Sequence, residues 1–359
     1  MKTYLVTGGA GFIGSNFVLY LLRTHEDVRV VNYDALTYAG NLENLAQVAD
    51  DERYAFVRAD VRDADVAARV IAQEQPDYIV NFAAESHVDR SIFDPGAFES
   101  TNVTGTLTML EAARRAWDDG KGGFGDHRFL QVSTDEVYGS LPLDNPEALF
   151  RETTPLAPRS PYSASKASAD LFCRAYSETY RMPVTVTRCS NNYGPRQFPE
   201  KLIPLVVNNA LNHKPIPVYG DGLNVRDWLF VDDHCRAIDL ALQAGCPGQV
   251  YNVGGRNERS NIYIVRTVIG LVARATGDDQ VNEGLIQHVE DRKGHDRRYG
   301  IDPSRAKRDL GWEPETAFED GIAQTVQWYL DNPDWVRNVT SGAYRAYYER
   351  AYGHRAVLE

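Results

Sequence analysis

Short apolar runs alternate with amphipathic segments through the first half of the chain. Runs rich in Val, Ile, Tyr and Phe predict strands, and they lie at residues 4–6, 28–33, 54–57, 78–82, 128–132 and 184–187. Apolar positions with helical spacing predict helices at residues 12–24, 64–74, about 100–116 and 162–180. Because strands that alternate with helices form parallel sheets, the pattern predicts an α/β fold with a Rossmann-type, doubly wound parallel sheet.

The pattern changes after about residue 190. Pro and Gly become frequent there, and the regular alternation fades. We expect residues 1–190 to form the Rossmann domain, with returning segments at roughly 226–255 and 300–325. Residues 191–359 are expected to form a smaller, discontinuous, mixed α/β lobe that includes a helix at 318–329.

Composition and charge narrow the class of protein. The 359 residues suffice for two lobes, and 43% hydrophobic with 25% charged residues is typical of a globular protein in water. The formal net charge of -12 argues against nucleic-acid or anionic-membrane partners, which need basic surface. The chain starts directly with a strand and has no apolar run long enough for a membrane span, so we expect a cytoplasmic protein.

The cysteines and histidines predict neither disulfides nor a metal site. The four cysteines include no CxxC pair, which favours free thiols in a reducing compartment. His87, His234 and His295 are dispersed and lack the spacing of metal ligands, so no metal is predicted.

A glycine-rich segment, TGGAGFIG from Thr7, separates the first predicted strand from the first helix. Gly8, Gly11 and Gly14 let the backbone turn tightly and approach a pyrophosphate at the helix N-terminus. An ordinary glycine-rich turn is the alternative. The position between a strand and a helix favours a dinucleotide site.

Asp34 ends the second predicted strand, 20 residues after Gly14. A carboxylate there accepts hydrogen bonds from a ribose and repels a 2′-phosphate, and residues 35–38 contain no Arg, so NAD is favoured over NADP. The alternative is that Asp34 only forms a turn. Asp60 and Val61, after the third strand, are candidates to border the adenine, although Asp is also common at loop starts.

Tyr162 and Lys166 lie four residues apart, on one face of a helix that begins at Ser160 and Pro161. A nearby ammonium group favours the phenolate, which can take a proton from a substrate hydroxyl while the carbon gives a hydride to a nicotinamide. An exposed helix face is the alternative. The place of the pair downstream of the glycine-rich segment favours catalysis.

Asp135 and Glu136 follow the predicted strand at 128–132, at its carboxyl end. Two nearby carboxyl groups tend to have separated pKa values, so that one acts as an acid and the other as a base. Beside a hydride-transfer device they predict proton removal and loss of a hydroxyl group after oxidation. The alternative is a solvated turn with two acidic residues.

Over nearly its whole length the chain resembles the dTDP-glucose 4,6-dehydratases of the extended short-chain dehydrogenase/reductase superfamily. The resemblance rests on TGGAGFIGSNF from Thr7, TYAGNLENL from Thr37, NFAAESHVDRSI from Asn81, STDEVYG from Ser133, PYSASKAS from Pro161, TRCSNNYGPRQFPEKLIPL from Thr187, VYGDGLNVRDWLFVDDH from Val218, YNVGG from Tyr251 and DRKGHDRRYGID from Asp291. Two positions depart from the pattern: Lys293, where Pro is expected, and Ser140, where an acidic residue is usual.

The resemblance implies an NAD-dependent lyase that converts dTDP-glucose into dTDP-4-keto-6-deoxyglucose and water. It implies that Tyr162, helped by Lys166, deprotonates the C4 hydroxyl, that Thr134 hydrogen-bonds the same oxygen, and that hydride passes to NAD. Glu136 then removes the C5 proton and Asp135 protonates the departing C6 hydroxyl, before hydride returns to C6. Asp135 and Glu136 argue against a nucleotide-sugar 4-epimerase or decarboxylase. An NAD-sensing protein without turnover would be expected to lack one of these groups.

The resemblance also implies the residues that bind both ligands and a partner. The predicted cofactor-binding residues are Gly8, Gly11, Phe12, Ile13, Gly14, Asp34, Leu36, Thr37, Asp60, Val61, Ala83, Ala84, Thr101, Tyr162, Lys166 and Asn191. The predicted substrate-binding residues are Glu85, Ser86, Thr134, Asn191, Lys201, Leu202, Pro217, Tyr219, Arg226, Asn261, Arg292, His295 and Tyr299. Helices 100–116 and 162–180 resemble the pair that forms a four-helix bundle in homodimers of the superfamily.

Overall fold

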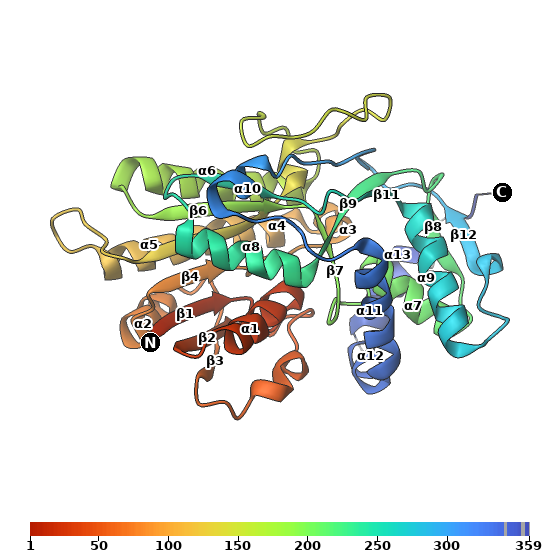
Figure 1. Ribbon diagram of the computed structural model, residues 1–359, viewed down its shortest axis with the longest axis horizontal. Coiled ribbons are helices and arrows are strands. Elements are labelled where there is room, and N and C mark those ends of the chain that lie inside the picture. Colours follow the sequence, from red (N-terminus) through yellow and green to blue (C-terminus); the bar gives the residue numbers. More distant parts are fainter. Residues whose placement is uncertain (341–342, 353–355, 359) are drawn as a thin grey trace.

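A seven-stranded parallel sheet organises the larger part of the computed structural model, which describes residues 1–340, 343–352 and 356–358 (Figure 1). The strands are β1 (Lys2–Thr7), β2 (Val28–Asp34), β3 (Tyr54–Arg58), β4 (Tyr78–Asn81), β5 (Arg128–Thr134), β6 (Val184–Cys189) and β10 (Val250–Val253). Their order is β10-β6-β5-β4-β1-β2-β3. The order reverses direction between β1 and β4, the point at which doubly wound sheets bind ligands. This confirms the predicted fold class.

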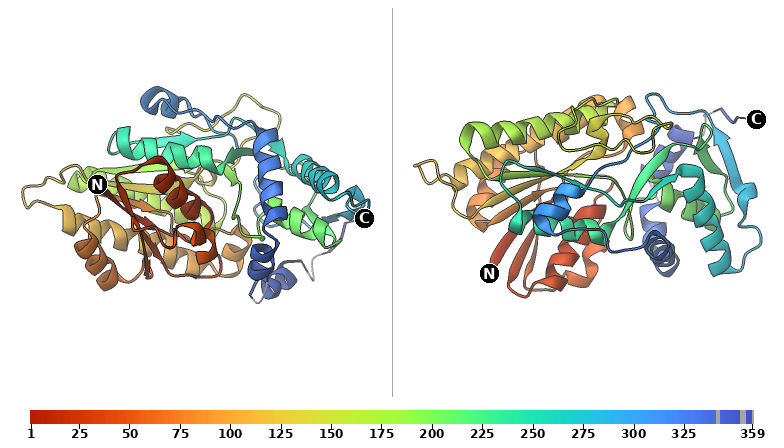
Figure 2. Two further views of the ribbon diagram at one scale, coloured as in Figure 1. Left: turned by 60° about the horizontal axis from the view of Figure 1, so that its bottom comes forward. Right: turned by 45° about the horizontal axis from the view of Figure 1, so that its top comes forward.

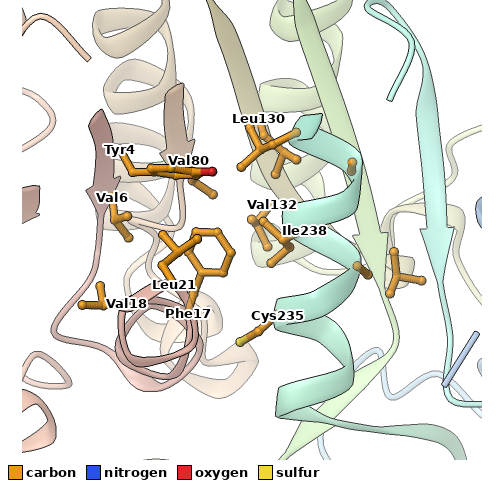
Figure 3. Close-up of a cluster of buried hydrophobic side chains, with 14 of the residues drawn as sticks. Tyr4, Val6, Phe17, Val18, Leu21, Val80, Leu130, Val132, Cys235 and Ile238 are labelled. Carbon is orange, nitrogen blue, oxygen red and sulfur yellow. The ribbon is translucent and has the colours of Figure 1, made fainter. Parts of the chain in front are cut away.

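Helices bury both faces of this sheet. Successive residues of β1 point to opposite sides, so Tyr4 and Val6 belong to one apolar cluster and Leu5 to the other. Phe17 and Leu21 join the first cluster from α1 (Figure 3). Both are fully buried, which stabilises the fold by about 1.5–3 kcal/mol for each side chain. The first face packs against α1 (Phe12–Thr24), α8 (Val231–Ala244) and α10 (Ser304–Leu310), and the second against α2 (Ala64–Glu74), α5 (Gly105–Trp117) and α6 (Pro161–Tyr180).

A smaller mixed lobe lies at the end of the molecule that carries the C-terminus (Figure 2). Its strand β9 lies between β11 and β7, and β12 pairs with β8. The strands are β7 (Asn191–Tyr193), β8 (Ile216–Tyr219), β9 (Val225–Phe230), β11 (Glu258–Ser260) and β12 (Ile286–Val289). The helices are α7 (Leu202–Leu211), α9 (Asn261–Thr276), α11 (Phe318–Asp331), α12 (Pro333–Val339) and α13 (Ala343–Tyr352). A separate apolar cluster with Val206, Val268 and Ile322 holds α7, α9 and α11 together.

Short helical segments lie between the longer elements. They are η1 (Leu42–Val48), α3 (Val88–Phe93), α4 (Pro95–Phe98), η2 (Glu99–Thr104), η3 (Asp135–Tyr138) and η4 (Glu283–Leu285). The helix predicted at about 100–116 is divided, because η2 is a π-helical turn and α5 begins only at Gly105. Tertiary contacts shape this turn: the Asn102 amide donates to the Glu85 carbonyl at 3.0 Å and to the Ser165 hydroxyl at 2.8 Å.

The predicted returning segments match the large sheet only in part. α8, β10 and α10 pack there, but β9 pairs with strands of the smaller sheet and α11 packs in the smaller lobe, against α7 and α9. The assignment of residues at roughly 226–255 and 300–325 to the Rossmann domain as returning segments stays a prediction. Apolar sequence alone does not tell which of two neighbouring cores a strand will join. The limits of the domains at 1–190 and 191–359 stay a prediction, and residues 341–342, 353–355 and 359 lie outside the described residues.

Replacing Gly with Ala should change the free energy of unfolding in opposite directions at two helical positions, Gly14 and Gly270. A Cβ atom on Gly14 of α1 would lie 2.2 Å from the Gly8 carbonyl oxygen, whereas one on Gly270 of α9 would meet only the Arg274 side chain at 3.5 Å. We expect Gly14→Ala to lower the free energy of unfolding by about 1–3 kcal/mol. Gly270→Ala should raise it by about 0.5–1 kcal/mol, because Gly is a poor helix former. Urea unfolding of both variants tests this, and equal effects would contradict the crowding at Gly14.

Candidate active site

A cavity of about 370 Å³ opens at the carboxyl ends of the central strands. It gathers residues from loops that are far apart in the sequence, as expected at the switch point of such a sheet. The predicted residues that line it are Gly8, Gly11, Phe12, Ile13, Gly14, Asp34, Thr37, Asp60, Val61, Ala83, Ala84, Glu85, Ser86, Thr101, Thr134, Asp135, Glu136, Tyr162, Lys166, Asn191 and Lys201.

The glycine-rich turn brings backbone to the edge of this cavity. Gly8 has a φ of +67°, and a Cβ atom there would lie 2.8 Å from the Ala83 nitrogen, so a side chain would be both strained and blocked. Gly11 occupies the N-cap of α1 and has no side chain with which to cap the helix. The backbone N–H groups of the first turn of α1 are thus accessible to an anion at the positive end of the helix dipole.

Asp34 is held at the end of β2 by two backbone groups. Its Oδ2 accepts a hydrogen bond from the Ala10 nitrogen at 2.9 Å, and its Oδ1 accepts one from the Leu36 nitrogen at 2.7 Å. Burial raises the pKa of Asp34, and the two backbone hydrogen bonds act against that shift. The carboxylate lines the cavity, as the sequence predicted, whereas Leu36 is not among the lining residues. A cofactor contact of Leu36 stays a prediction.

Asp135 and Glu136 have different electrostatic surroundings. Burial raises the pKa of Asp135 well above its usual value, and the Glu136 and Asp227 carboxylates raise it further. Burial also raises the pKa of Glu136, but Arg292, Arg226 and Lys201 all lower it. The pKa of Asp135 is therefore raised more strongly than that of Glu136, a difference in the direction that an acid and a base need.

Thr134 connects the strand β5 to these two carboxyl groups. Its hydroxyl caps η3 by accepting a hydrogen bond from the Glu136 nitrogen at 3.2 Å, and it donates to Asp135 Oδ1 at 3.3 Å. The strand runs through Thr134, two residues beyond the predicted end at 132, so Asp135 and Glu136 begin the short helix that follows.

The first turn of α6 fixes Tyr162 and Lys166 at the cavity. Ser160 and Ser163 form a reciprocal capping box, and Pro161 takes the first position of the helix. We expected Lys166 to lower the pKa of the phenol, but burial raises the pKa of Tyr162 well above 10, and the Glu136 carboxylate raises it further. The Lys166 ammonium group donates to the Val132 carbonyl at 2.7 Å, which leaves two of its three N–H groups for other partners.

A second group of predicted substrate-binding residues lies outside the lining of this cavity: Leu202, Pro217, Tyr219, Arg226, Asn261, Arg292, His295 and Tyr299. Within this group, the Arg226 guanidinium lies 4.2 Å from the centre of the Tyr299 ring, and its Nη2 donates to the Asp296 carbonyl at 2.9 Å. Pro217 lines a different cavity of about 1050 Å³ beneath α13. Their contact with a substrate stays a prediction, although Arg226 and Arg292 are close enough to lower the pKa of Glu136.

Several residues that line the cavity were not predicted from the sequence. In the segment that begins at Thr187, only three residues were predicted to bind a ligand. Cys189, Gln197, Phe198 and Glu200 belong to that segment and also line the cavity. Arg62 does so as well, and its Nη2 lies 2.6 Å from Asp60 Oδ2. Residues 35–38 contain no Arg, whereas Arg62 follows the next strand, β3.

Two kinds of feature are absent from the described residues. Within residues 1–340, 343–352 and 356–358, no group of three or more His, Cys, Asp or Glu residues is placed to hold a metal ion. Across the same residues, no helix has both the length and the apolar character needed to cross a membrane.

A doubly wound sheet with a glycine-rich turn at β1 and a Tyr-x-x-x-Lys helix defines a protein of the short-chain dehydrogenase/reductase class. The family model for GDP-mannose 4,6 dehydratase matches residues 5–325, so the chain belongs to that family. It is 53% identical to the dTDP-glucose 4,6-dehydratase of Shigella flexneri over 98% of this chain and 99% of that protein. It is 55% identical to the dTDP-glucose 4,6-dehydratase of Xanthomonas campestris pv. campestris (strain B100), over 96% and 98%.

A solved structure extends this likeness to three dimensions. The dTDP-glucose 4,6-dehydratase of Bacillus anthracis str. Ames, crystallised in complex with NAD, superposes with a TM-score of 0.83 and 48% sequence identity. The match covers 94% of this chain and all of the other chain.

Proposed function

We propose that this chain is an NAD-dependent dTDP-glucose 4,6-dehydratase, which converts dTDP-glucose into dTDP-4-keto-6-deoxyglucose and water. The observation that carries the proposal is the pair Asp135 and Glu136, which lies beside Tyr162 in one cavity and in which burial raises the pKa of Asp135 more strongly than that of Glu136. The relatives of Shigella and Xanthomonas bear the name of this activity and are similar over almost the whole chain.

The cavity fits NAD. Gly8 and Gly14 leave no room for side chains where a pyrophosphate would approach α1, and Asp34 faces the place expected for the ribose. Bound NAD accepts a hydride from the sugar and returns it later in the same cycle, so it is not consumed. The other predicted cofactor residues that line this cavity are Gly11, Phe12, Ile13, Thr37, Asp60, Val61, Ala83, Ala84, Thr101, Tyr162, Lys166 and Asn191.

The residues of the cavity account for the proton movements of the reaction. Tyr162 in its phenolate form takes the proton of the C4 hydroxyl group and becomes a neutral phenol, and Thr134 positions that oxygen. The resulting ketone makes the C5 proton acidic, and the Glu136 carboxylate removes it. The protonated Asp135 gives its proton to the C6 oxygen as the C6–O bond breaks, so that water leaves.

Positively charged side chains at the site attract the sugar nucleotide, although the protein as a whole is acidic. The net charge of -12 repels a sugar nucleotide at long range, so the site must supply positive charge itself. Lys201, Arg226 and Arg292 all lie within electrostatic reach of Glu136. We assign the diphosphate of dTDP-glucose to these three cations, and each guanidinium group can hold a phosphate through two parallel hydrogen bonds.

An assay without added cofactor tests this function. Purified protein is incubated with dTDP-glucose, and base is then added to develop the absorbance of a 4-keto-6-deoxy sugar. The signal should appear without external NAD, because the cofactor stays bound. A C4 epimer as the product would indicate an epimerase, and no product from intact, NAD-loaded protein would refute the proposed activity.

A homodimer in the cytoplasm is the assembly that we propose. The helices α5 and α6 would pair with the same helices of a second copy in a four-helix bundle. Leu171 and Phe172 of α6 are 55% and 36% exposed although both are large apolar side chains, which supports a covered surface at this place.

Replacing Leu171 with Arg should convert the dimer into a monomer. A charge buried at the centre of a helix bundle has no partner, so we expect a dissociation constant raised at least about 100-fold. Light scattering at micromolar concentration measures the mass. Leu143→Arg is the matched control, because Leu143 is 43% exposed in a loop outside α5 and α6. A wild-type monomer, or a dimer that persists in Leu171→Arg, would contradict this interface.

A further inference from the structure

The short helix α3 carries two neighbouring, oppositely charged residues that reach into the smaller lobe. We propose that Asp89 and Arg90 are positioning residues that place Arg292 and Lys201 for the diphosphate of the substrate. The inference rests on the proposed function and goes beyond it, because neither residue lines the cavity or was predicted from the sequence. Figure 1 places α3 near the junction between the large sheet and the smaller lobe.

Asp89 contacts two segments of the smaller lobe. Its side chain is 3% exposed. Its Oδ2 accepts a hydrogen bond from the Tyr219 hydroxyl at the end of β8, at 2.7 Å. Its Oδ1 lies 3.9 Å from Arg292 Nη1, close enough for attraction and too far for a hydrogen bond. Asp89 therefore supplies Arg292 with a counter-charge without consuming its donors.

Arg90 reaches a third segment, immediately before Lys201. Its Nε donates to Glu200 Oε2 at 2.9 Å, and the Glu200 side chain is 1% exposed. Glu200 Oε1 accepts a second hydrogen bond from the Tyr38 hydroxyl at 3.0 Å, and the Arg90 guanidinium lies 3.8 Å from the centre of the Tyr38 ring. Lys201 itself donates to the Ser86 carbonyl at 2.7 Å. The Glu200 carboxylate thus connects the segment that carries Lys201 to the loops that follow β2 and β4.

Unpaired buried atoms indicate that the cluster is built for a ligand as well as for stability. Within the described part of the chain, Asp89 Oδ1 and Arg292 Nε are buried and have no hydrogen-bond partner. Such atoms are costly in a folded protein, and positions that break this rule are expected at functional sites. An anion that bound Arg292 would use the donor that Asp89 leaves open.

The position of each cation follows from these contacts. Arg292 is half-buried within electrostatic reach of Asp89, Tyr219 and Tyr299, and Lys201 is half-buried within reach of Glu200 and Asp89. Since α3 pairs with both segments, it sets the separation between the guanidinium and the ammonium group. A diphosphate is bound well only when both groups are in place, whereas the reacting sugar carbons contact other residues. Loss of an α3 contact should therefore raise KM and leave kcat nearly unchanged.

The test measures dTDP affinity by calorimetry and turnover by the keto-sugar assay. Asp89→Asn keeps the shape of the side chain and removes its charge, and Glu200→Gln does the same for the partner of Arg90. Each is expected to weaken dTDP binding about tenfold and to raise KM by a similar factor, with kcat within about twofold of the wild type. Asp94→Asn is the matched control, because Asp94 is an exposed carboxylate just after α3.

Double variants separate positioning from general loss of structure. If Asp89 acts through Arg292, then Asp89→Asn should weaken dTDP binding no further in an Arg292→Gln background, and Glu200→Gln should behave likewise with Lys201→Met. Additive losses, or an Asp89→Asn variant that binds dTDP as tightly as the wild type or more tightly, would overturn the inference. A wild type that binds dTDP without turnover would refute the proposed function alone. A wild type that binds no dTDP would overturn both.

Discussion

Replacing Glu136 with Gln should stop the elimination and leave the first oxidation intact. The variant keeps Tyr162 and Thr134, so the C4 hydroxyl can still be oxidised. It lacks the base for the C5 proton, and loss of a general base typically lowers the rate by about 10²–10⁴-fold. The expected product of a single turnover is therefore a dTDP-4-keto sugar that retains its C6 hydroxyl, which mass spectrometry detects.

Solvent deuterium distinguishes the two carboxyl groups. In Glu136→Gln, we expect no exchange of the C5 proton with the solvent. In the matched variant Asp135→Asn, Glu136 is present and the acid for the C6 oxygen is missing, so C5 exchange should continue while water loss is slow. C5 exchange at the wild-type rate in Glu136→Gln would show that another group removes this proton.

The pH dependence of kcat should be bell-shaped for the same reason. As the pH falls through the pKa of Glu136, the base becomes protonated and activity is lost on the acid side. As the pH rises through the pKa of Asp135, which burial and two carboxylates raise well above its usual value, the acid is lost on the alkaline side. Glu136→Gln should lack the acid limb, and Asp135→Asn should lack the alkaline limb.

The large sheet was predictable from the sequence because its signals are local. Each strand of the Rossmann domain is an apolar run bounded by polar residues, and the glycine-rich turn sits where β1 meets α1. The helix α9 has an equally clear sequence pattern, although no helix was predicted there. Ile264, Val265, Val268 and Ile269 follow helical spacing, and Ser260 caps the helix. The frequent Pro and Gly of the second half hid this pattern.

The contacts of the site depend on residues that only the fold brings together. Tyr38 and Glu200 are 162 positions apart, and nothing in their neighbouring sequence indicates the hydrogen bond between them. Lys166 shows the same limit. Its spacing from Tyr162 predicts an ammonium group that acts on the phenol, which stays a prediction, and nothing in the sequence indicates its hydrogen bond to the Val132 carbonyl. Periodicity gives the face of a helix on which a residue lies, and the surrounding chain decides what its side chain contacts.

Replacing Tyr162 with Phe should abolish the reaction at its first step. Burial raises the pKa of Tyr162 well above its usual value, so the phenolate that accepts the C4 proton depends on stabilisation by a nearby positive charge. The ring is 9% exposed and packs edge-on against Phe98 at 6.2 Å, so Phe fills the same space and the fold should be retained. Only the proton acceptor for the C4 hydroxyl disappears.

The expected loss in Tyr162→Phe is about 10²–10⁴-fold in kcat. Unlike Glu136→Gln, this variant should form no 4-keto sugar and exchange no C5 proton, because both require the ketone. Its midpoint of thermal unfolding should stay close to that of the wild type. Formation of a 4-keto sugar at the wild-type rate would show that Tyr162 does not accept the C4 proton, and the assignment would then pass to Thr134 or a bound water. A loss confined to later steps would instead place the hydroxyl in the return of hydride to C6.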